Sequence, residues 1–269
     1  MALGRWNEGR LLVLDVDGVL IDPCGSFERC AAMALAEIAP GLPWSDELYW
    51  AFKRVPGFNN DFRLTAAAAA LYELGEIKDG RHEHLKGGFA HLGQQAQKRI
   101  AELEPLCKER VQFYYQGVKH LEHPLITLPE LESIAGWDVA ILTGRPPEEL
   151  ALAFDVLGFE LPAACDTCPE FRKPEPGGLL HLAEAFGAHE IFFVGDTMDD
   201  ATCLRRARDT VRDRNLALEL VFVAVNKLRH EISQPEDLAY PTLRDFISSG
   251  ELAKKADQRP PHGSCQISG

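Results

Sequence analysis

The sequence predicts a doubly wound α/β fold, with a parallel sheet and a helical domain inserted after the first strand. The first observation is a set of four short, nearly continuous apolar segments, at residues 11–15, 137–142, 191–195 and 220–225. Strands that are apolar on both faces are typical of a parallel sheet covered by helices on each side. The second observation is that helical patterns separate the last three segments, whereas residues 21–136 contain no convincing strand. Strand and helix alternating in this way predict a doubly wound core.

Three helices are expected around the later strands, over residues 147–158, 178–187 and 199–207. The first of them begins with Pro147 and two glutamates and ends at Gly158. Proline near the first helical position and glycine just past the last one are the usual start and stop signals of a helix. These helices would connect parallel strands and cover both faces of the sheet.

The long segment after the first strand predicts an inserted helical domain at residues 22–130, with the core at residues 1–21 and 131–253. Linkers are expected near residues 20–26 and 123–127. Residues 254–269 turn polar, with Pro, Gly and Ser, and predict a flexible tail. Proline and glycine break the inserted segment into five expected helices: residues 27–38, 46–54, 61–74, 91–103 and 105–116.

Length and charge exclude several functional classes. The chain has 269 residues, with 28 Lys and Arg against 41 Asp and Glu, and a net charge of −13. Nucleic acids and anionic lipids are bound by clustered positive charge, so this balance argues against both partners. The apolar runs are too short to span a bilayer, and the N-terminus lacks the apolar region of a secretory signal. We therefore expect a cytoplasmic protein, as a monomer or a homodimer.

The seven cysteines do not predict a disulfide framework, because their number is odd and they are scattered along the chain. Cys165 and Cys168 form one CxxC pair. A structural zinc would need two more ligands at a suitable spacing, and the sequence offers none. The pair is better explained as a coincidence in a loop than as a metal or redox site.

The most informative motif is Asp15-Val16-Asp17-Gly18, which directly follows the first apolar segment. In open α/β sheets the ligand crevice lies beyond the carboxyl ends of the strands, so both aspartates fall at the expected mouth of a site. A lone aspartate there would be explained by capping of a turn. Two aspartates and a glycine after a buried strand favour a functional site.

Two further motifs offer groups that bind anions. Thr143 and Gly144 follow another apolar segment and precede a helix, so they combine a hydroxyl, exposed backbone N–H groups and a helix N-terminus. Lys173 lies between Arg172 and Pro174, in a stiff loop that suits a fixed positive charge. Each signal is weak alone, since Thr-Gly turns and surface lysines are common.

The last motif repeats the logic of the first, with Asp196, Asp199 and Asp200 after an apolar segment. Clustered carboxylate oxygens are hard ligands that suit Mg²⁺ better than zinc or copper. A metal, a fixed lysine, a hydroxyl and a carboxylate able to form an aspartyl-phosphate together indicate phosphoryl transfer.

In their order, these motifs resemble those of the haloacid-dehalogenase-like (HAD) hydrolase superfamily. The correspondence runs through Asp15-x-Asp17-Gly18, Thr143-Gly144, Lys173-Pro174 and Gly195-Asp196-x-x-x-Asp200. The resemblance covers roughly residues 10–21 and 124–230, and its four motifs together are specific. It implies a Rossmann-like core, and the insertion between the first two motifs matches the superfamily's helical cap by position and character.

The resemblance also implies roles for these residues. Asp15 would be the nucleophile, and Asp17 would be the general acid that protonates the leaving oxygen and then activates water. Thr143, Gly144 and Lys173 would hold the phosphoryl oxygens. Asp15, the backbone carbonyl of Asp17, Asp196 and Asp200 would ligate Mg²⁺, although Asp199 could take the place of Asp200. An acid role requires that burial and neighbours raise the pKa of Asp17.

The resemblance favours a Mg²⁺-dependent phosphatase acting on a small phosphorylated metabolite, with three alternatives open. A phosphonate hydrolase would need a cap lysine that forms a Schiff base, for which Lys53 is the candidate. A sugar phosphomutase shares every core motif. A non-catalytic sensor of a phosphorylated ligand would not need the acid Asp17, and neither would a dehalogenase.

Substrate choice is expected to depend on the inserted domain, because the core motifs contact only the phosphoryl group. The best candidates are Arg54, Asn59 and Asn60, around a Gly turn that precedes a helix. Arg54 could hold a carboxylate or phosphate of the substrate. The alternative for Asn60 is a plain helix N-cap.

Overall fold

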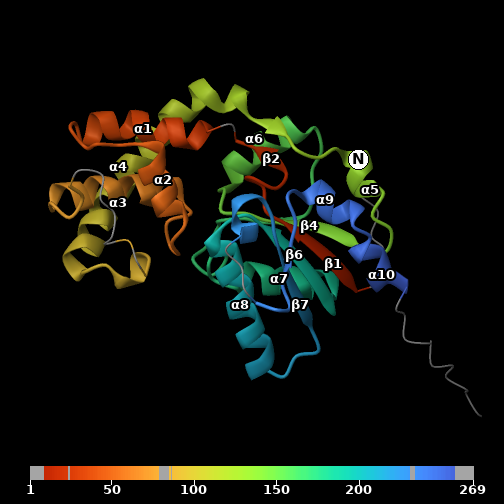
Figure 1. Ribbon diagram of the computed structural model, residues 1–269. Coiled ribbons are helices and arrows are strands. Elements are labelled where there is room, and N and C mark those ends of the chain that lie inside the picture. Colours follow the sequence, from red (N-terminus) through yellow and green to blue (C-terminus); the bar gives the residue numbers. More distant parts are fainter. Residues whose placement is uncertain (1–8, 24, 79–84, 86, 231–233, 258–269) are drawn as a thin grey trace, which may run out of the picture.

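The computed structural model describes residues 9–23, 25–78, 85, 87–230 and 234–257. Its main sheet has six strands in the order β5-β4-β1-β6-β7-β8, and every neighbouring pair is parallel (Figure 1). β1 is central, so the chain turns to opposite sides of it for the later strands, and such a switch point opens a crevice at the strand ends. The strands are β1 (Arg10–Leu14), β4 (Asp138–Leu142), β5 (Ala163–Ala164), β6 (Glu190–Gly195), β7 (Glu219–Ala224) and β8 (Leu238–Ala239).

Helices cover both faces of this sheet, because alternate strand residues point to opposite sides and the central residues of the strands are apolar on both. Leu12 and Leu14 face a layer formed by α5 (Leu128–Glu132), α6 (Pro147–Leu157), α9 (Leu243–Ser248) and α10 (Glu251–Asp257). Leu11 and Val13 face α7 (Gly177–Phe186) and α8 (Met198–Asp213). Burying one such side chain contributes about 1.5–3 kcal/mol. The structure therefore confirms the doubly wound α/β class.

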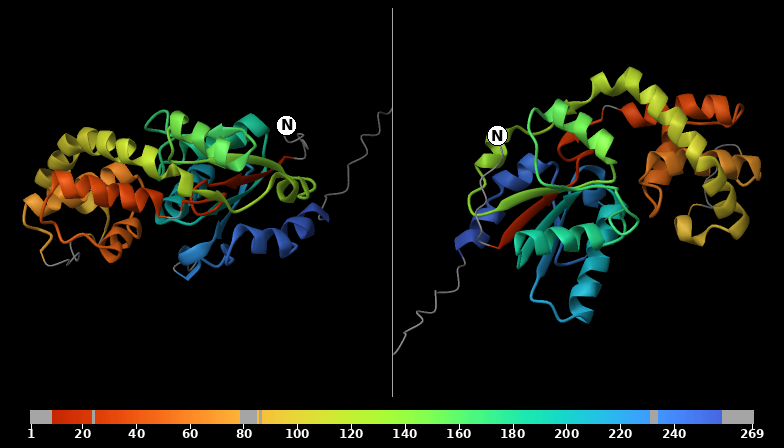
Figure 2. Two further views of the ribbon diagram at one scale, coloured as in Figure 1. Left: turned by 90° about the horizontal axis from the view of Figure 1, so that it is seen from above. Right: turned by 180° about the vertical axis from the view of Figure 1, so that it is seen from behind.

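The inserted segment forms a separate helical body beside the sheet (Figures 1 and 2). It consists of α1 (Ser26–Ile38), α2 (Asp46–Lys53), α3 (Asp61–Glu73) and α4 (Gln94–Val118), with the 3₁₀ turn η2 (Phe89–His91) before α4. Residues 66–70, all alanine, are fully buried in its core, where small side chains allow close approach of α3 and α4. None of the helices in the described ranges combines the length and apolar character that crossing a bilayer would require.

Both linkers of the helical body are paired with each other. β2 (Ile21–Asp22) and β3 (His123–Pro124) form a two-stranded antiparallel ribbon. The backbone N–H of Leu125 also donates to the carbonyl of Leu20, at 2.8 Å. The 3₁₀ turn η3 (Lys119–Leu121) leads from α4 into this ribbon, and a further turn, η4 (Asn226–His230), follows β7.

Several boundaries differ from those expected. The four strands match within one residue, but α8 continues to Asp213 and the predicted domain boundary at residues 130/131 falls inside α5. The flexible tail predicted for residues 254–269 is wrong for residues 254–257, which end α10, because Lys255 pairs with Glu190 and Glu219 at 2.8 and 2.7 Å. Residues 258–269 lie outside the described ranges, as do residues 1–8.

The two helices predicted on either side of residue 104 form one continuous helix, α4, with Pro105 inside it. Proline removes a backbone hydrogen bond and costs about 3 kcal/mol within a helix. The buried faces before and after it, with Ile100 and Leu103 on one side and Cys107 and Val111 on the other, pack in the same body. Their burial outweighs the penalty, so the helix continues.

We expect Pro105→Ala to raise the free energy of unfolding by about 1–3 kcal/mol, because it restores the missing N–H at an exposed position. Urea denaturation monitored by circular dichroism measures this change. The matched control is Pro129→Ala, since Pro129 lies in the first turn of α5, where proline is tolerated. An unchanged or lower stability of the Pro105 variant would contradict this account of α4.

Candidate active site

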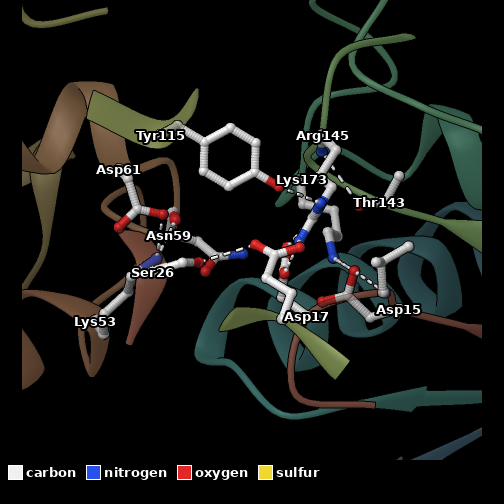
Figure 3. Close-up of polar contacts among 12 residues, drawn as sticks. Asp15, Asp17, Ser26, Lys53, Asn59, Asp61, Tyr115, Thr143, Arg145 and Lys173 are labelled. Atoms are coloured by element: carbon white, nitrogen blue, oxygen red, sulfur yellow. Dashed lines mark hydrogen bonds and ion pairs between the residues drawn. The ribbon is translucent and has the colours of Figure 1, made fainter. Parts of the chain in front are cut away.

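The motif residues meet at the carboxyl edge of the sheet, and Figure 3 shows four of them, Asp15, Asp17, Thr143 and Lys173. Asp15 follows β1, Thr143 and Gly144 follow β4, and Asp196 follows β6. Because β4, β1 and β6 are adjacent and parallel, their carboxyl ends lie side by side. Lys173 reaches the same place from the loop before α7. The structure thus brings together residues that lie up to 181 positions apart, from Asp15 to Asp196.

Lys173 is the centre of this cluster. Its Nζ lies 2.9 Å from Asp15 Oδ1 and donates a hydrogen bond of 2.6 Å to Asp200 Oδ1. All three side chains are almost completely buried. Burial alone would lower the pKa of Lys173, but the two carboxylates raise it above its ordinary value. The lysine is therefore a fixed cation, as the sequence predicted.

Three carboxylates surround that lysine closely enough to share one cation. Asp15, Asp196 and Asp200 each offer an oxygen within 4.8 Å of the others. Three negative charges and one lysine leave a net charge of −2, which one divalent cation balances. Burial, together with Asp200 and Asp17, raises the pKa of Asp15 to about 7, although Lys173 lowers it. Burial and Asp15 raise that of Asp196 well above its ordinary value. These all-oxygen donors with unbalanced charge fit Mg²⁺.

Asp199 and Asp200 have different surroundings although they are adjacent. Asp200 Oδ2 accepts from the backbone N–H and hydroxyl of Thr197, at 3.0 and 2.6 Å, in the capping box that begins α8. Its other oxygen accepts from Lys173. Asp199 belongs to neither contact and turns toward the helical body instead. Asp200 is therefore the residue placed to support a metal.

Gly18 allows the turn after Asp17 to pass close to Asp196. Its φ is +70°, and a Cβ at this position would lie 2.0 Å from Asp196 Oδ2. Any other residue would displace that carboxylate from the triad. The glycine of the first motif is thus explained by a close approach as well as by a turn.

Asp17 is clamped by Arg145, a residue that sequence reasoning left without a role. Arg145 donates to both carboxylate oxygens, with Nη2 to Oδ1 at 2.6 Å and Nε to Oδ2 at 3.1 Å. Burial raises the pKa of Asp17, but the guanidinium outweighs it and the net pKa is below the ordinary value. The expectation of a raised pKa is therefore wrong for this state of the site, because the paired arginine stabilises the carboxylate.

Arg145 is itself held by the helical body and its linker. Nη2 donates to Glu122 at 3.1 Å and Nη1 donates to Tyr115 of α4 at 3.2 Å. Ser26 donates to the other oxygen of Glu122 at 2.8 Å, and the guanidinium lies over the ring of Phe27 at 5.2 Å. These partners lie far from Arg145 in sequence, and only the arginine next to Thr143-Gly144 hinted at the network.

The two phosphate-binding candidates that follow β4 differ in their access to the cavity. Gly144 lines the cavity above Asp15 and Asp17. Thr143 is fully buried and its hydroxyl oxygen accepts from the backbone N–H of Arg145 at 3.2 Å. That bond leaves the hydroxyl proton of Thr143 for another acceptor.

Cys165 and Cys168 are free thiols.

The three substrate-binding candidates in the helical body differ in whether they line the cavity. Asn59 and Asn60 line the cavity, but Asn60 Oδ1 also caps α3 by accepting from the N–H groups of Phe62 and Arg63. Arg54 ends α2, is exposed and is absent from the described lining of the cavity. Lys53 donates to the carbonyl of Asn59 at 2.6 Å and to Asp61 at 2.9 Å.

A cavity of about 80 Å³ lies between the sheet edge and the helical body. A larger one, of about 500 Å³, adjoins it and shares Asp17, Lys53, Asn59 and Thr197. Glu149 of α6 also lines the smaller cavity, and burial raises its pKa to about 7. A phosphoryl group near Lys173 would therefore have room for the rest of its molecule.

The sequence profile of the haloacid dehalogenase-like hydrolase family matches residues 10–208. The chain belongs to this family. Its fold is also that of solved structures with low sequence identity. A hydrolase from Pseudomonas syringae has a TM-score of 0.59 and 16% identity, over 91% of this chain and 98% of that one. No curated protein sequence gives a significant match.

Two further structures have names that concern phosphate chemistry. A phosphatase from Thermococcus thioreducens has a TM-score of 0.55 and 18% identity, over 90% of this chain and 99% of that one. A β-phosphoglucomutase from Clostridium difficile has a TM-score of 0.54 and 16% identity, over 93% and 99%. At these identities the likeness is one of fold.

We expect Mg²⁺ to raise the midpoint of thermal unfolding more at pH 8 than at pH 6. The pKa of Asp15 rises from 3.8 to about 7 on folding, so the metal-free chain loses stability as the pH rises through this window. At pH 6 a proton competes with the ion, and at pH 8 it does not. Asp196→Asn is the control that removes a ligand, and equal shifts at both pH values would contradict the prediction.

Arg145→Met should lower the free energy of unfolding by about 3–5 kcal/mol, because it leaves the buried carboxylate of Glu122 without its cation. Combining it with Glu122→Gln should recover part of that loss. Arg110→Met is the matched control, since Arg110 pairs with Glu37 at the surface, where such pairs contribute about 0–1 kcal/mol. Urea denaturation of the three variants and the wild type checks this, and equal losses for Arg145→Met and Arg110→Met would refute it.

Proposed function

We propose that the chain is a Mg²⁺-dependent phosphatase that hydrolyses a small phosphorylated metabolite through an aspartyl-phosphate on Asp15. The observation that carries this proposal is the position of Lys173, bonded to Asp15 and Asp200 in a buried cluster that also contains Asp196. A carboxylate attacks a phosphate dianion only where nearby cations offset the repulsion. Mg²⁺, when bound by Asp15, Asp196, Asp200 and the backbone carbonyl of Asp17, would supply most of that positive charge.

In the first half of the proposed reaction, Asp15 attacks phosphorus and the bond to the leaving oxygen breaks. Lys173, Thr143 and the N–H of Gly144 hold the phosphoryl oxygens during the transfer. Asp17 gives a proton to the leaving oxygen. In the second half, Asp17 takes a proton from water, which attacks the phosphorus and restores the carboxylate of Asp15.

The pairing with Arg145 suits Asp17 to the second half, where it must be a carboxylate. For the first half it needs a proton. An arriving phosphate ester brings negative charge close to Asp17, which raises the pKa of a carboxyl group, and also competes for Arg145. We infer that the substrate itself prepares Asp17 as an acid.

Substrate selection is proposed to rest on the larger cavity. It extends from Asp17 to Tyr49 and Trp50 of α2 and to Arg229 of η4. A leaving group of metabolite size would contact both the helical body and the core. Asn59, which lines both cavities, would lie beside the scissile bond.

With Mg²⁺ present, the protein should hydrolyse p-nitrophenyl phosphate, and Asp15→Asn should lower turnover by at least about 10³-fold because it removes the nucleophile. Release of p-nitrophenol measures this. Asp155→Asn, on the exposed side of α6, is the matched control and should keep wild-type turnover. Inactivity of the wild type over a broad panel of phosphate esters would refute the phosphatase proposal.

Each alternative function predicts a different experimental result. A phosphomutase would leave a phosphoryl group on a second hydroxyl of a sugar phosphate rather than release inorganic phosphate. A phosphonate hydrolase would give a borohydride-trapped adduct of Lys53 with an aldehyde. The bonds of Lys53 to Asn59 and Asp61 count against that amine acting as a nucleophile. A sensor would bind phosphate without turnover.

A further inference from the structure

Asp199 makes a contact that the proposed chemistry does not use. Its Oδ1 accepts from the backbone N–H of Gly57 at 2.8 Å, and its Oδ2 lies 3.3 Å from the N–H of Asn59. The donors lie in the loop between α2 and α3 of the helical body, about 140 residues away in sequence. One carboxylate of the core thus accepts from two amides, two residues apart, in the loop that lines the cavity.

The contact is buried, which makes it strong. Asp199 is only 3% exposed. Hydrogen bonds from N–H groups to a carboxylate are short and about twice as strong as those between neutral groups. Separating the loop from the core would leave this carboxylate without the partners seen here until water entered.

The loop is also bonded to α2 and α3, so its contact with Asp199 connects both helices to the core. The N–H of Asn59 is held by Asp199 of the core, while its carbonyl accepts from Lys53 of α2. The next residue, Asn60, caps α3. Asn59 is therefore one point at which the helical body is attached to the core, and it lines the same cavity as Asp17.

The loop is also shaped for this contact. Gly57 has a φ of +92°, and a Cβ there would lie 2.7 Å from the Cβ of Phe89. Behind it, the carbonyl of Pro56 accepts from the N–H of Phe89 at 3.0 Å. The loop backbone is thus also held by the segment at Phe89, while the amides of Gly57 and Asn59 donate to Asp199.

We propose that Asp199 is a positioning residue: it latches the loop at residues 56–60 onto the core and so places Asn59 and Lys53 over the bound ester. This inference rests on the proposed phosphatase function for its kinetic consequences only. The two adjacent aspartates thus have different proposed roles. Asp200 supports Lys173 and the metal, and Asp199 holds the helical body.

The kinetic test compares a ligand that needs the helical body with one that needs the core alone. With Mg²⁺, Asp199→Ala should lower kcat/KM for p-nitrophenyl phosphate about ten-fold or more, the loss expected from two charged hydrogen bonds. The inhibition constant of inorganic phosphate, which contacts the core groups, should change by less than about two-fold. Asp199→Asn keeps one acceptor oxygen and should be intermediate. Glu148→Gln is the matched control, since it removes a charge from the first turn of α6 without touching the loop.

A second measurement does not depend on turnover. Hydrogen exchange at the amides of Gly57 and Asn59 should accelerate in Asp199→Ala and stay slow in Glu148→Gln, with unchanged circular dichroism in both. Equal weakening of the ester and of inorganic phosphate would place Asp199 in the core site and overturn the latch. Unchanged exchange and unchanged ester kinetics would overturn it as well. If the wild type hydrolyses nothing, the proposed function fails, and exchange at these amides still decides the latch.

Discussion

The ammonium group of Lys173 between Asp15 and Asp200 is the interaction on which the site depends. Asp15, Asp196 and Asp200 offer oxygens within 4.8 Å of one another, and the ammonium group offsets part of the repulsion between these carboxylates. The fold supplies the geometry: adjacent parallel strands bring Asp15 and Asp196 together, and the capping box of α8 fixes Asp200 by its own backbone. The same lysine that would hold a phosphoryl group thus also makes the metal-free site stable enough to exist.

A second ion pair, Asp17 with Arg145, lies in the same site and connects it to the helical body. Arg145 reaches Tyr115 of α4 and Glu122 beside the linker ribbon. A movement of the helical body against the core would therefore change the position of Arg145 and its hydrogen bonds to Asp17. On the opposite side, the loop at Asn59 approaches the same cavity. Asp17, the proposed acid–base residue, is thus connected to the helical body, for which we propose a role in recognising the rest of the substrate.

The sequence predicted best what local patterns determine. Buried strands, helix ends and the positions of Asp15, Thr143 and Lys173 follow from short runs of residues. The features that the sequence did not predict depend on packing between residues that lie far apart in the chain. The partner of Asp17 lies 128 residues away in sequence. Pro105 was predicted to begin a new helix, because the burial that keeps α4 continuous on both sides of it comes from tertiary packing. Asp199 and Asp200 could not be separated, since their directions differ only once the first residue of α8 is known.

The β2–β3 ribbon has a consequence for how such proteins diversify. It brings the chain into and out of the helical body at one place, across pairs formed by Ile21 with Pro124 and Asp22 with His123. A different body could be inserted between these two short strands without altering the order of the sheet. The core and its charge cluster would then be a fixed chemical platform, and the inserted segment an exchangeable module.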